Sequence, residues 1–127
     1  MKTIIKTKQA AAPIGPYNQA VMINGFLYTS GQIALHPETG KTEFSSIEEE
    51  TQRVMKSLEA ILKEADLDFS HVIKTSIFIS DMGNFSKINK IYGSYFNENT
   101  APARETVEVA RLPKDANVEI SLIAFKG

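Results

Sequence analysis

The stretch Pro102–Ala124 reads PARETVEVARLPKDANVEISLIA. It contains two predicted strands, separated at 111–117 by the segment RLPKDAN, which is rich in turn-forming residues. Arg104 opens the first strand, and Glu119 lies near the start of the second, Val118–Phe125, which is otherwise mostly apolar. A carboxylate in such a strand is costly unless it is paired or takes part in chemistry. We therefore interpret Arg104 and Glu119 as the reactive polar pair of the chain.

Each of these two residues also has a purely structural interpretation. Arg104 follows a loop-to-strand junction, and its planar guanidinium suits a bidentate contact with a carboxylate. It could instead pair at the surface with Glu105 or Glu108. Glu119 could orient or deprotonate water, or it could belong to a structural ion pair buried at an interface. The residues alone leave these alternatives open.

Strand geometry limits how the pair can meet. If the two predicted strands form a hairpin about Leu112–Ala116, Glu119 lies opposite Glu108 or Val109. Arg104 is then four or five residues further along, a separation of about 13–16 Å at the rise of a strand. Either the two strands are not neighbours, or a second chain completes the site.

Local signals elsewhere predict a hairpin and two helices. Asn24-Gly25 lies between two apolar segments and favours a type I′ turn, because both central residues of that turn need positive φ. Ser46 and Glu49 form a capping-box pattern before an amphipathic segment. The other predicted strands are Lys2–Thr7, Ala20–Ile23, Phe26–Ser30 and Val72–Ser80, and the predicted helices are Ser45–Ala65 and about Asn84–Asn97.

The resulting order, β-β-β-α-β-α-β-β, is typical of an α+β fold with a sheet of about six strands and two α-helices on one face. The predicted strand at 72–80 has apolar residues on both of its faces, so the face away from the helices must also be covered. Pairing with further copies of the chain through the sheet is the expected solution. The sequence therefore predicts a homo-oligomer.

Length, charge and cysteine content bound the class of protein. With 127 residues the chain is predicted to form one domain, 1–127, and its 14 basic and 15 acidic residues give a net charge of −1. A protein that binds nucleic acid usually has an excess of positive charge, and this chain does not. The absence of cysteine excludes thiolate nucleophiles and fits a reducing cytoplasm. Without a visible signal peptide or an apolar run of about 20 residues, we expect a cytoplasmic protein and no membrane segment.

Other residues are weaker candidates for ligand binding. Tyr17 ends a loop shaped by two prolines, and Ser30-Gly31 ends a predicted strand, where a hydroxyl and backbone groups could meet a ligand. A strand-ending turn is the simpler explanation of Ser30-Gly31 without further context. Asn89 lies beside the aromatic stripe of the second helix, either solvated or facing an interface. His36 and His71 have no partner at ligand spacing, so no metal site is predicted.

These residues together resemble a known family. The segment at 102–124 is similar to the Pro-Ala-Arg…Glu-Val-Ala-Arg-Leu-Pro…Val-Glu-Ile segment of the reactive intermediate deaminases of the RidA or YjgF type. Three further stretches agree in the same order: Ile14–Tyr17, Thr29–Ile33, and Val72–Thr75 leading to Asn84-Phe85, Asn89 and Tyr92. The likeness covers essentially the whole chain without a large insertion.

The resemblance implies a chorismate-mutase-like α+β fold. It also implies a homotrimer whose sheets form a central barrel, with active sites between neighbouring subunits. Family members of this type hydrolyse 2-imino acids, such as 2-iminopropanoate and 2-iminobutanoate, and their enamine tautomers to 2-keto acids and ammonia. No metal and no organic cofactor is implied.

The resemblance also implies a role for each candidate residue. Arg104 would bind the substrate carboxylate, and Glu119 would position or activate the attacking water. The backbone and hydroxyl of Ser30-Gly31 would contact the imine end, while Tyr17 and Asn89 would shape and close the pocket. An imine is already electrophilic, so oriented water and a proton shuttle suffice for hydrolysis.

The chain departs from the family pattern directly after the arginine, where relatives often have a small residue and then a cysteine. Here those positions hold Glu105 and Thr106. Thr106 replaces a thiol that hydrolysis does not need. The carboxylate of Glu105 would compete with substrate if it turned towards Arg104, but strand alternation predicts that it points to the opposite face.

Two other functions compete with the deaminase. One is a non-catalytic trimer that binds small carboxylates and acts through protein partners; it would need Arg104 but not Glu119. The other is an RNA-cleaving inhibitor of translation, an activity attributed to some relatives. The net charge of −1 and the lack of a basic, aromatic surface argue against RNA as a partner.

Overall fold

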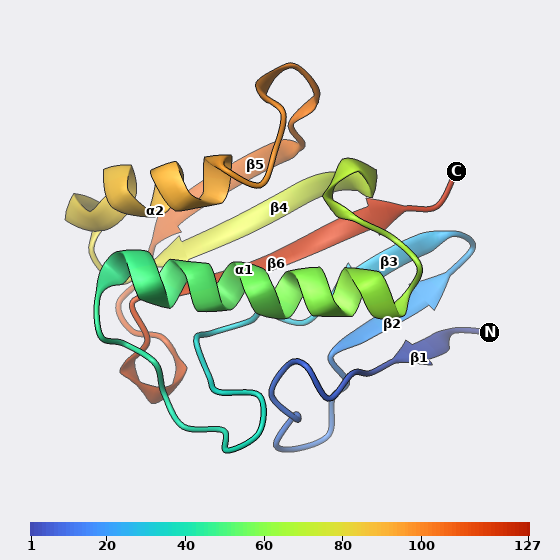
Figure 1. Cartoon of the computed structure of the whole chain (residues 1–127), viewed down its shortest axis with the longest axis horizontal. Helices are drawn as coiled ribbons and strands as arrows, with labels where there is room; N and C mark the ends of the chain where they lie inside the picture. The colour runs from blue at the N-terminus through green and yellow to red at the C-terminus, as the bar shows by residue number, and fades with distance from the viewer.

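A computed structural model describes the whole chain, residues 1–127, and places two α-helices on one face of a six-stranded sheet (Figure 1). The α+β class and the element order predicted from the sequence are confirmed. The strands are β1 (Thr3–Ile5), β2 (Ala20–Ile23), β3 (Phe26–Thr29), β4 (Val72–Ile79), β5 (Ala103–Glu108) and β6 (Val118–Phe125), and the helices are α1 (Ile47–Glu64) and α2 (Phe85–Gly93). Neither helix has the length and apolar composition needed to cross a membrane.

The strand order is β1-β2-β3-β6-β4-β5, so the last strand of the chain lies in the middle of the sheet. It is antiparallel to both of its neighbours, β3 and β4. The preceding strand, β5, pairs in parallel with the far side of β4, because the crossover through α2 returns the chain in the same direction. β5 and β6 therefore form no hairpin and are not neighbours, which is the first of the two alternatives that strand geometry left open.

The predicted hairpin between β2 and β3 is confirmed. Asn24 and Gly25 both have positive φ, 51° and 83°, as a type I′ turn requires. The turn also holds the end of the chain, because the N–H of Lys126 donates a 2.7 Å hydrogen bond to the carbonyl of Gly25. The rings of Phe26 and Phe125 pack beside it with their centroids 4.6 Å apart.

The first helix begins where its cap was predicted. The hydroxyl of Ser46 accepts a 3.0 Å hydrogen bond from the N–H of Glu49, while the Glu49 carboxylate accepts from the hydroxyl of Ser45 instead of closing the capping box. The apolar stripe of α1 forms one buried cluster with the sheet. Its main members are Val54, Met55, Leu58, Ile61, Leu62, Leu27, Ile77, Ile79 and Ile120.

The second helix is shorter than predicted, because it ends at Gly93 and not near Asn97. Beyond it, the rings of Tyr95 and Phe96 pack against Phe69 with centroids 5.1 Å and 5.3 Å from it. This contact with a segment distant in the sequence draws the chain out of the helical path, and tertiary packing overrides local propensity.

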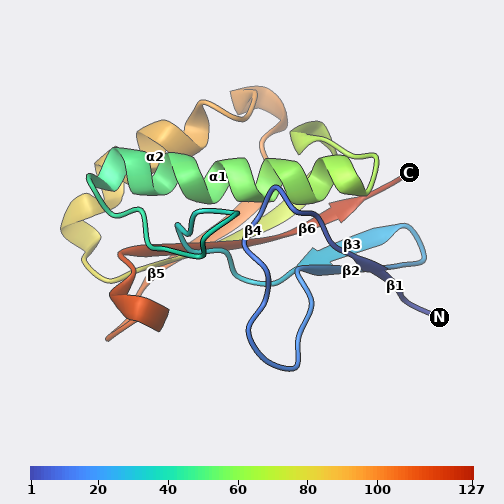
Figure 2. The same ribbon diagram turned by 60° about the horizontal axis from the view of Figure 1, so that its bottom comes forward.

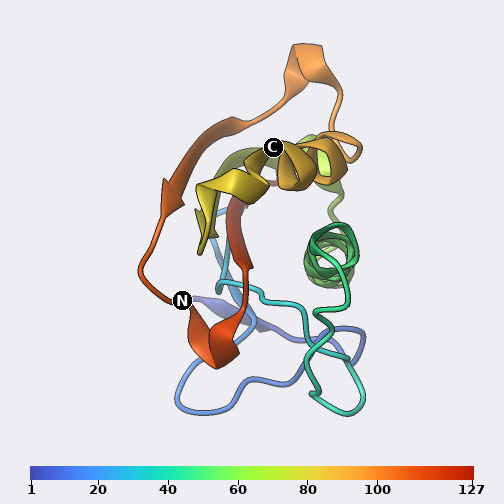
Figure 3. The ribbon, with the colours of Figure 1, turned by 90° about the vertical axis from the view of Figure 1, so that its left-hand side faces the viewer.

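The sheet has a helix face and an open face. On β4, Thr75, Ile77 and Ile79 are buried beneath the helices, while Lys74, Ser76 and Phe78 alternate with them on the other side. Both α1 and α2 lie on the same side of the sheet in Figures 2 and 3, and neither crosses to the other side. The side away from the helices is called the open face below.

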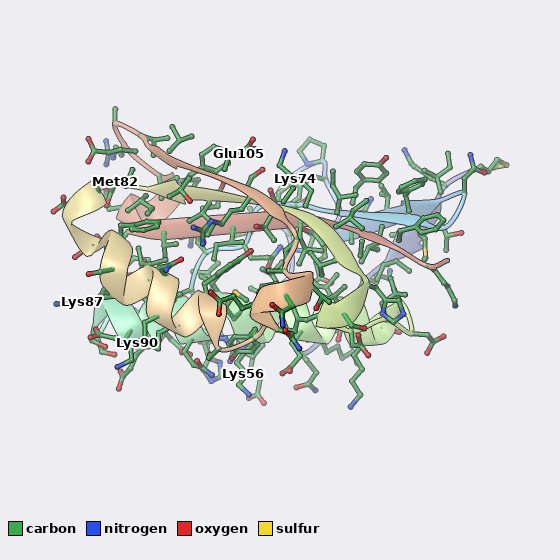
Figure 4. The ribbon with its side chains drawn as sticks, turned by 90° about the horizontal axis from the view of Figure 1, so that it is seen from above. Lys56, Lys74, Met82, Lys87, Lys90 and Glu105 are labelled. Atoms are coloured by element: carbon green, nitrogen blue, oxygen red, sulfur yellow. The ribbon has the colours of Figure 1, made fainter.

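The open face is mixed, and not apolar throughout as the sequence suggested. Over β2, β3 and β6 it exposes large apolar side chains, among them Tyr28 (43% exposed) and Phe125 (39%). Over β4 and β5 it carries polar groups, including Lys74 and Glu105, whose charged atoms lie 3.3 Å apart. Figure 4 shows these two residues on the side opposite the helices. A partner on this face must therefore meet an apolar half and a polar half.

We predict that Gly25→Ala lowers the free energy of unfolding by about 1–2 kcal/mol, because an alanine is strained at positive φ. Its Cβ would also lie 3.1 Å from the carbonyl oxygen of Lys126. The matched control is Gly93→Ala in α2, where a Cβ meets nothing within 4 Å. That variant should gain about 0.5 kcal/mol from higher helix propensity. Urea unfolding of both variants measures the difference, and equal effects would contradict the prediction.

Candidate active site

Arg104 lies on the helix face of β5, beneath α2. It pairs in register with Thr75 of β4, a buried residue of that face. Its Nη1 donates a 2.6 Å hydrogen bond to Oδ1 of Asn89. Its guanidinium carbon lies 5.5 Å from the centre of the Phe85 ring and 5.2 Å from that of Tyr92, within the range of cation–π attraction. The guanidinium is thus oriented by α2, and its other N–H groups remain available for a planar anion.

The ring of Tyr92 packs against the guanidinium of Arg104. Its hydroxyl shares a 2.7 Å hydrogen bond with the hydroxyl of Thr75, and only 5% of its surface is exposed. Burial raises the pKa of Tyr92 above its ordinary value, against smaller opposing effects of the Thr75 hydrogen bond and the Arg104 charge. The ring therefore stays neutral at physiological pH and acts as a platform, not as an acid or base.

A groove of about 630 Å³ opens beside Arg104. We call it the Arg104 pocket. Its lining residues come from α2, from the loop that follows it and from the start of β5, and they are Asn89, Tyr92, Gly93, Phe96, Glu98, Ala101, Pro102 and Arg104. This pocket contains the cation Arg104 and Asn89, a predicted substrate-binding residue, but it does not contain Glu119.

A second cavity, of about 520 Å³, surrounds Glu119. We call it the Glu119 pocket. It brings together Tyr17, Ser30, Gly31 and Glu119, which the sequence predicted for one site. Tyr17 is half-exposed. Ser30 donates its hydroxyl proton to the carbonyl of Asn18 over 2.5 Å, so only the lone pairs of its oxygen are left for a ligand.

Gly31 touches the carboxylate of Glu119. Gln32 and Ile120 exchange two backbone hydrogen bonds, of 2.8 Å and 3.1 Å, which bring the end of β3 against β6. A Cβ at Gly31 would lie 2.6 Å from Oε2 of Glu119, so a side chain there would push the carboxylate away. Neither the N–H nor the carbonyl of Gly31 makes a hydrogen bond within the chain. Both backbone groups are available to a ligand beside the carboxylate.

The Glu119 carboxylate has no hydrogen bond and no ion pair within the chain, although the residue is partly buried. Partial burial without a compensating partner raises the pKa of Glu119 above its ordinary value. A carboxylate with a raised pKa is a stronger base than an exposed one, and a base is most effective when its pKa lies near the working pH. The group is therefore suited to accepting a proton from water.

Arg104 and Glu119 lie on opposite faces of the sheet. Arg104 is opposite Thr75 on β4, and Glu119 is opposite Phe78. Thr75 and Phe78 are three residues apart, so their side chains, and those of their partners, point in opposite directions. Two strand spacings and three residues of rise also separate the two backbones by roughly 14 Å. One small molecule cannot contact both residues of a single chain.

Comparisons with known proteins show the family of the chain. The family model described as Endoribonuclease L-PSP matches residues 7–126. The chain belongs to this family. A mouse protein named 2-iminobutanoate/2-iminopropanoate deaminase is 41% identical over 127 residues, which is 100% of this chain and 93% of the mouse protein. The RidA or YjgF resemblance inferred from the sequence is thereby confirmed.

Other family members carry different names. A Lactococcus lactis protein that carries the name of a regulator, AldR, is 50% identical over 121 residues, or 95% of each chain. The crystal structure of Escherichia coli TdcF with bound serine superimposes with a TM-score of 0.92 and 38% identity, covering 98% of this chain and 99% of that one. Small-molecule binding is thus seen on this fold, in a protein of the same family.

The two positions that depart from the family pattern face different ways. Glu105 points to the open face, where it accepts a 2.5 Å hydrogen bond from Ser76 and pairs with Lys74. The Ser76 hydrogen bond first, and Lys74 second, lower the pKa of Glu105. The prediction that this carboxylate turns away from Arg104 is confirmed. Thr106 faces the helices beside Arg104, and its hydroxyl oxygen is buried without a hydrogen-bond partner.

The histidines of this family member serve turns in the backbone. Nδ1 of His36 accepts hydrogen bonds from the N–H groups of Glu38 and Thr39, and Nδ1 of His71 accepts from that of Asp68. No group of three or more His, Asp or Glu side chains gathers where it could hold a metal ion.

Sequence reasoning missed two parts of the site. It assigned Phe85 and Tyr92 to the apolar stripe of a helix, because nothing local shows that Arg104 lies beneath them. It also missed that Pro113 and Lys114 line the Glu119 pocket. Lys114 has a φ of 55°, a left-handed conformation that is uncommon for a residue other than glycine. Backbone strain of this kind is common at functional sites. The sequence of this segment, however, predicts only a turn and not a left-handed lysine.

We predict that Glu119→Gln raises the thermal stability of the protein at neutral pH. The folded state raises the pKa of this carboxyl, so its charged form costs stability once the pH exceeds the pKa in the folded protein. The glutamine variant should match the wild type near pH 4 and gain on it as the pH rises to about 8. Melting curves across this range measure the difference. If Glu119→Gln instead becomes less stable than the wild type as the pH rises, the carboxylate has a stabilising partner.

Proposed function

We propose that this protein is a 2-imino acid deaminase that works as a homotrimer. It hydrolyses 2-imino acids such as 2-iminopropanoate and 2-iminobutanoate to 2-keto acids and ammonia. The observation that carries the proposal is the division of the site into two open half-sites. Arg104 lines one pocket without Glu119, and Glu119 lines the other pocket without Arg104. The name of the mouse family member supports the reaction class.

The two half-sites meet when neighbouring chains pack through their sheets. Arg104 and Glu119 lie on opposite faces of one chain, so a ring of copies can bring the Arg104 pocket of one subunit against the Glu119 pocket of the next. The exposed apolar side chains of the open face supply surface to bury in such a ring. The expectation of three subunits per ring rests on the family resemblance.

Arg104 binds the substrate carboxylate in this scheme. Asn89, Phe85 and Tyr92 hold the guanidinium in place from one side, which leaves a fork of N–H donors for two parallel hydrogen bonds to a carboxylate. Serine, the molecule bound in the TdcF structure, has a carboxylate next to a carbon that carries nitrogen, and a 2-imino acid has the same arrangement. The clamp fixes which face of the imine carbon meets water.

Glu119 acts on the water. Its carboxylate accepts a proton as the water oxygen bonds to C2 of the imine and the C=N π electrons move to nitrogen, giving a carbinolamine. Glu119 then returns this proton to the nitrogen to complete the neutral carbinolamine, and it transfers the hydroxyl proton to the same nitrogen as the C–N bond breaks, so that the C2 oxygen becomes a carbonyl and ammonia leaves. One water is consumed and no redox change occurs. The free N–H and carbonyl of Gly31 lie beside this carboxylate and can contact the nitrogen.

The remaining predicted residues shape the pocket. Ser30 and Tyr17 line its wall next to Glu119, and the Ser30 oxygen can accept a hydrogen bond from the imine N–H. Asn89 serves from the other half-site by orienting Arg104.

The first test is turnover. Imines made in place by an amino-acid oxidase should be converted to keto acids faster with wild-type protein than without it. Glu119→Gln should lower kcat by about 100-fold or more, because the general base is lost. Arg104→Ala should lower kcat/KM by a similar factor, and Arg104→Lys should restore little of it, because lysine lacks the planar fork. Folded wild-type protein that gives no acceleration would refute the deaminase and favour a carboxylate-binding regulator.

The second test is complementation between chains. Arg104→Ala and Glu119→Gln chains should each be nearly inactive alone. When they are unfolded and refolded together in equal amounts, every mixed ring of three contains one site with both residues intact, so about a quarter of wild-type activity should return. Each variant refolded alone is the control. No recovery in verified mixed trimers would mean that the site does not cross the subunit boundary.

A further inference from the structure

Glu50 is a buried carboxylate that the proposed reaction does not use. It lies in the first part of α1 and has no exposed surface. Both of its oxygens accept hydrogen bonds from one residue: Oε2 from the backbone N–H of Asn117 and Oε1 from the side-chain amide of Asn117, each at 2.7 Å. No lysine, arginine or histidine pairs with it. It is a buried carboxyl group held only by two N–H donors.

Such a group is expensive unless its hydrogen bonds are complete. Two features lower the cost for Glu50. Its two acceptors are both satisfied at short distance by charge-assisted hydrogen bonds. It also lies near the amino end of α1, where the helix dipole favours negative charge. An apolar side chain at this position would leave the backbone N–H and the side-chain amide of Asn117 without their acceptor, so the carboxylate is what ties α1 to Asn117.

Asn117 connects Glu50 to the candidate site. It directly precedes β6 and is two residues from Glu119. Its carbonyl also accepts a 3.1 Å hydrogen bond from the N–H of Ser80, at the end of β4. The start of β6 is therefore held from two sides, by a helix and by a strand. This end of β6 lies on the same side of the molecule as the amino end of α1 (Figure 1).

The turn before Asn117 needs such an anchor. Lys114 and Asp115 both have left-handed backbone conformations, with φ of 55° and 57°. This strain persists only where the surroundings fix the chain on both sides. Leu112 is buried on one side and Ala116 on the other, next to Asn117. Lys114 also lines the Glu119 pocket, so the anchored turn forms part of the pocket wall.

We propose that Glu50 is a positioning residue for this site: its clamp on Asn117 fixes the start of β6 and the strained turn, and so holds the Glu119 carboxylate against Gly31. The inference rests on the proposed function for its kinetic consequence. Glu50 itself touches no substrate. It works through the backbone, at a site so tight that a Cβ added to Gly31 would lie 2.6 Å from Oε2 of Glu119.

Variants that exchange the donor and acceptor groups of Glu50 and Asn117 test this proposal. Asn117→Asp places a second carboxylate against Glu50 and removes a donor, which breaks the clamp. Glu50→Gln, Asn117→Asp together restore it, because the new amide donates to the new carboxylate and its oxygen still accepts the backbone N–H. Glu50→Gln alone should be mild, because the Asn117 amide can rotate to present its oxygen. Glu48→Gln, an exposed carboxylate on the same helix turn, is the control.

We expect Asn117→Asp to lower kcat by about 100-fold, as a small misplacement of a catalytic group does, with KM changed by less than about threefold. The double variant should recover most of kcat. In a Glu119→Gln background, Asn117→Asp should cause no further loss, because the group that it misplaces is already gone. Equal losses with and without Glu119 would overturn the proposal, since a merely structural role lowers both alike.

A crystal structure of Asn117→Asp separates this inference from the proposed function. The Glu119 carboxylate should be displaced from Gly31, while Arg104 and Asn89 stay in place. If wild-type protein does not hydrolyse imines, the proposed function fails, and the displacement alone decides whether Glu50 positions Glu119. An unmoved carboxylate with a broken clamp would overturn the positioning role whatever the activity.

Discussion

The alternation of side chains along β4 is the constraint on which the rest of the structure depends. This strand lies between β5 and β6 and sets the register of both. Arg104 is opposite Thr75 and Glu119 is opposite Phe78, an odd number of residues apart, so the pleat sends the two side chains to opposite faces. One then lies beneath α2 and the other opens on the side without helices. The fold therefore keeps the two halves of the proposed site apart.

The two halves are organised by opposite physical means. Arg104 is surrounded by favourable contacts: an amide oxygen, two aromatic rings, and a tyrosine kept neutral by burial. Glu119 is left without a partner, which raises its pKa and keeps it reactive. Its position therefore cannot come from contacts of its own carboxylate. It comes from the backbone, through the close approach of Gly31 and the hydrogen bonds that hold Asn117 at the start of β6.

The sequence predicts what local interactions determine. The Asn24-Gly25 turn and the Ser46 cap follow from the backbone preferences of single residues. Alternation also gave the outward direction of Glu105. The neighbours of β6 were not predictable in this way, because they lie far off in the sequence, and the end of α2 depends on rings packing against Phe69. Choosing Arg104 and Glu119 as a pair needed only residue types, whereas seeing that they occupy different faces needed the register of a third strand. Their catalytic roles stay predictions.

The three-residue separation of Thr75 and Phe78 also limits how this chain can change over evolutionary time. Substitutions in β4 alter packing by degrees, and a core can absorb many of them. A single residue inserted or deleted between these two positions is different in kind, because it reverses the parity of the strand and flips every side chain beyond it. Arg104 and Glu119 would then share one face, and the proposed division of the site between chains would be lost in one step. Length, more than composition, is the property of β4 that selection has reason to protect.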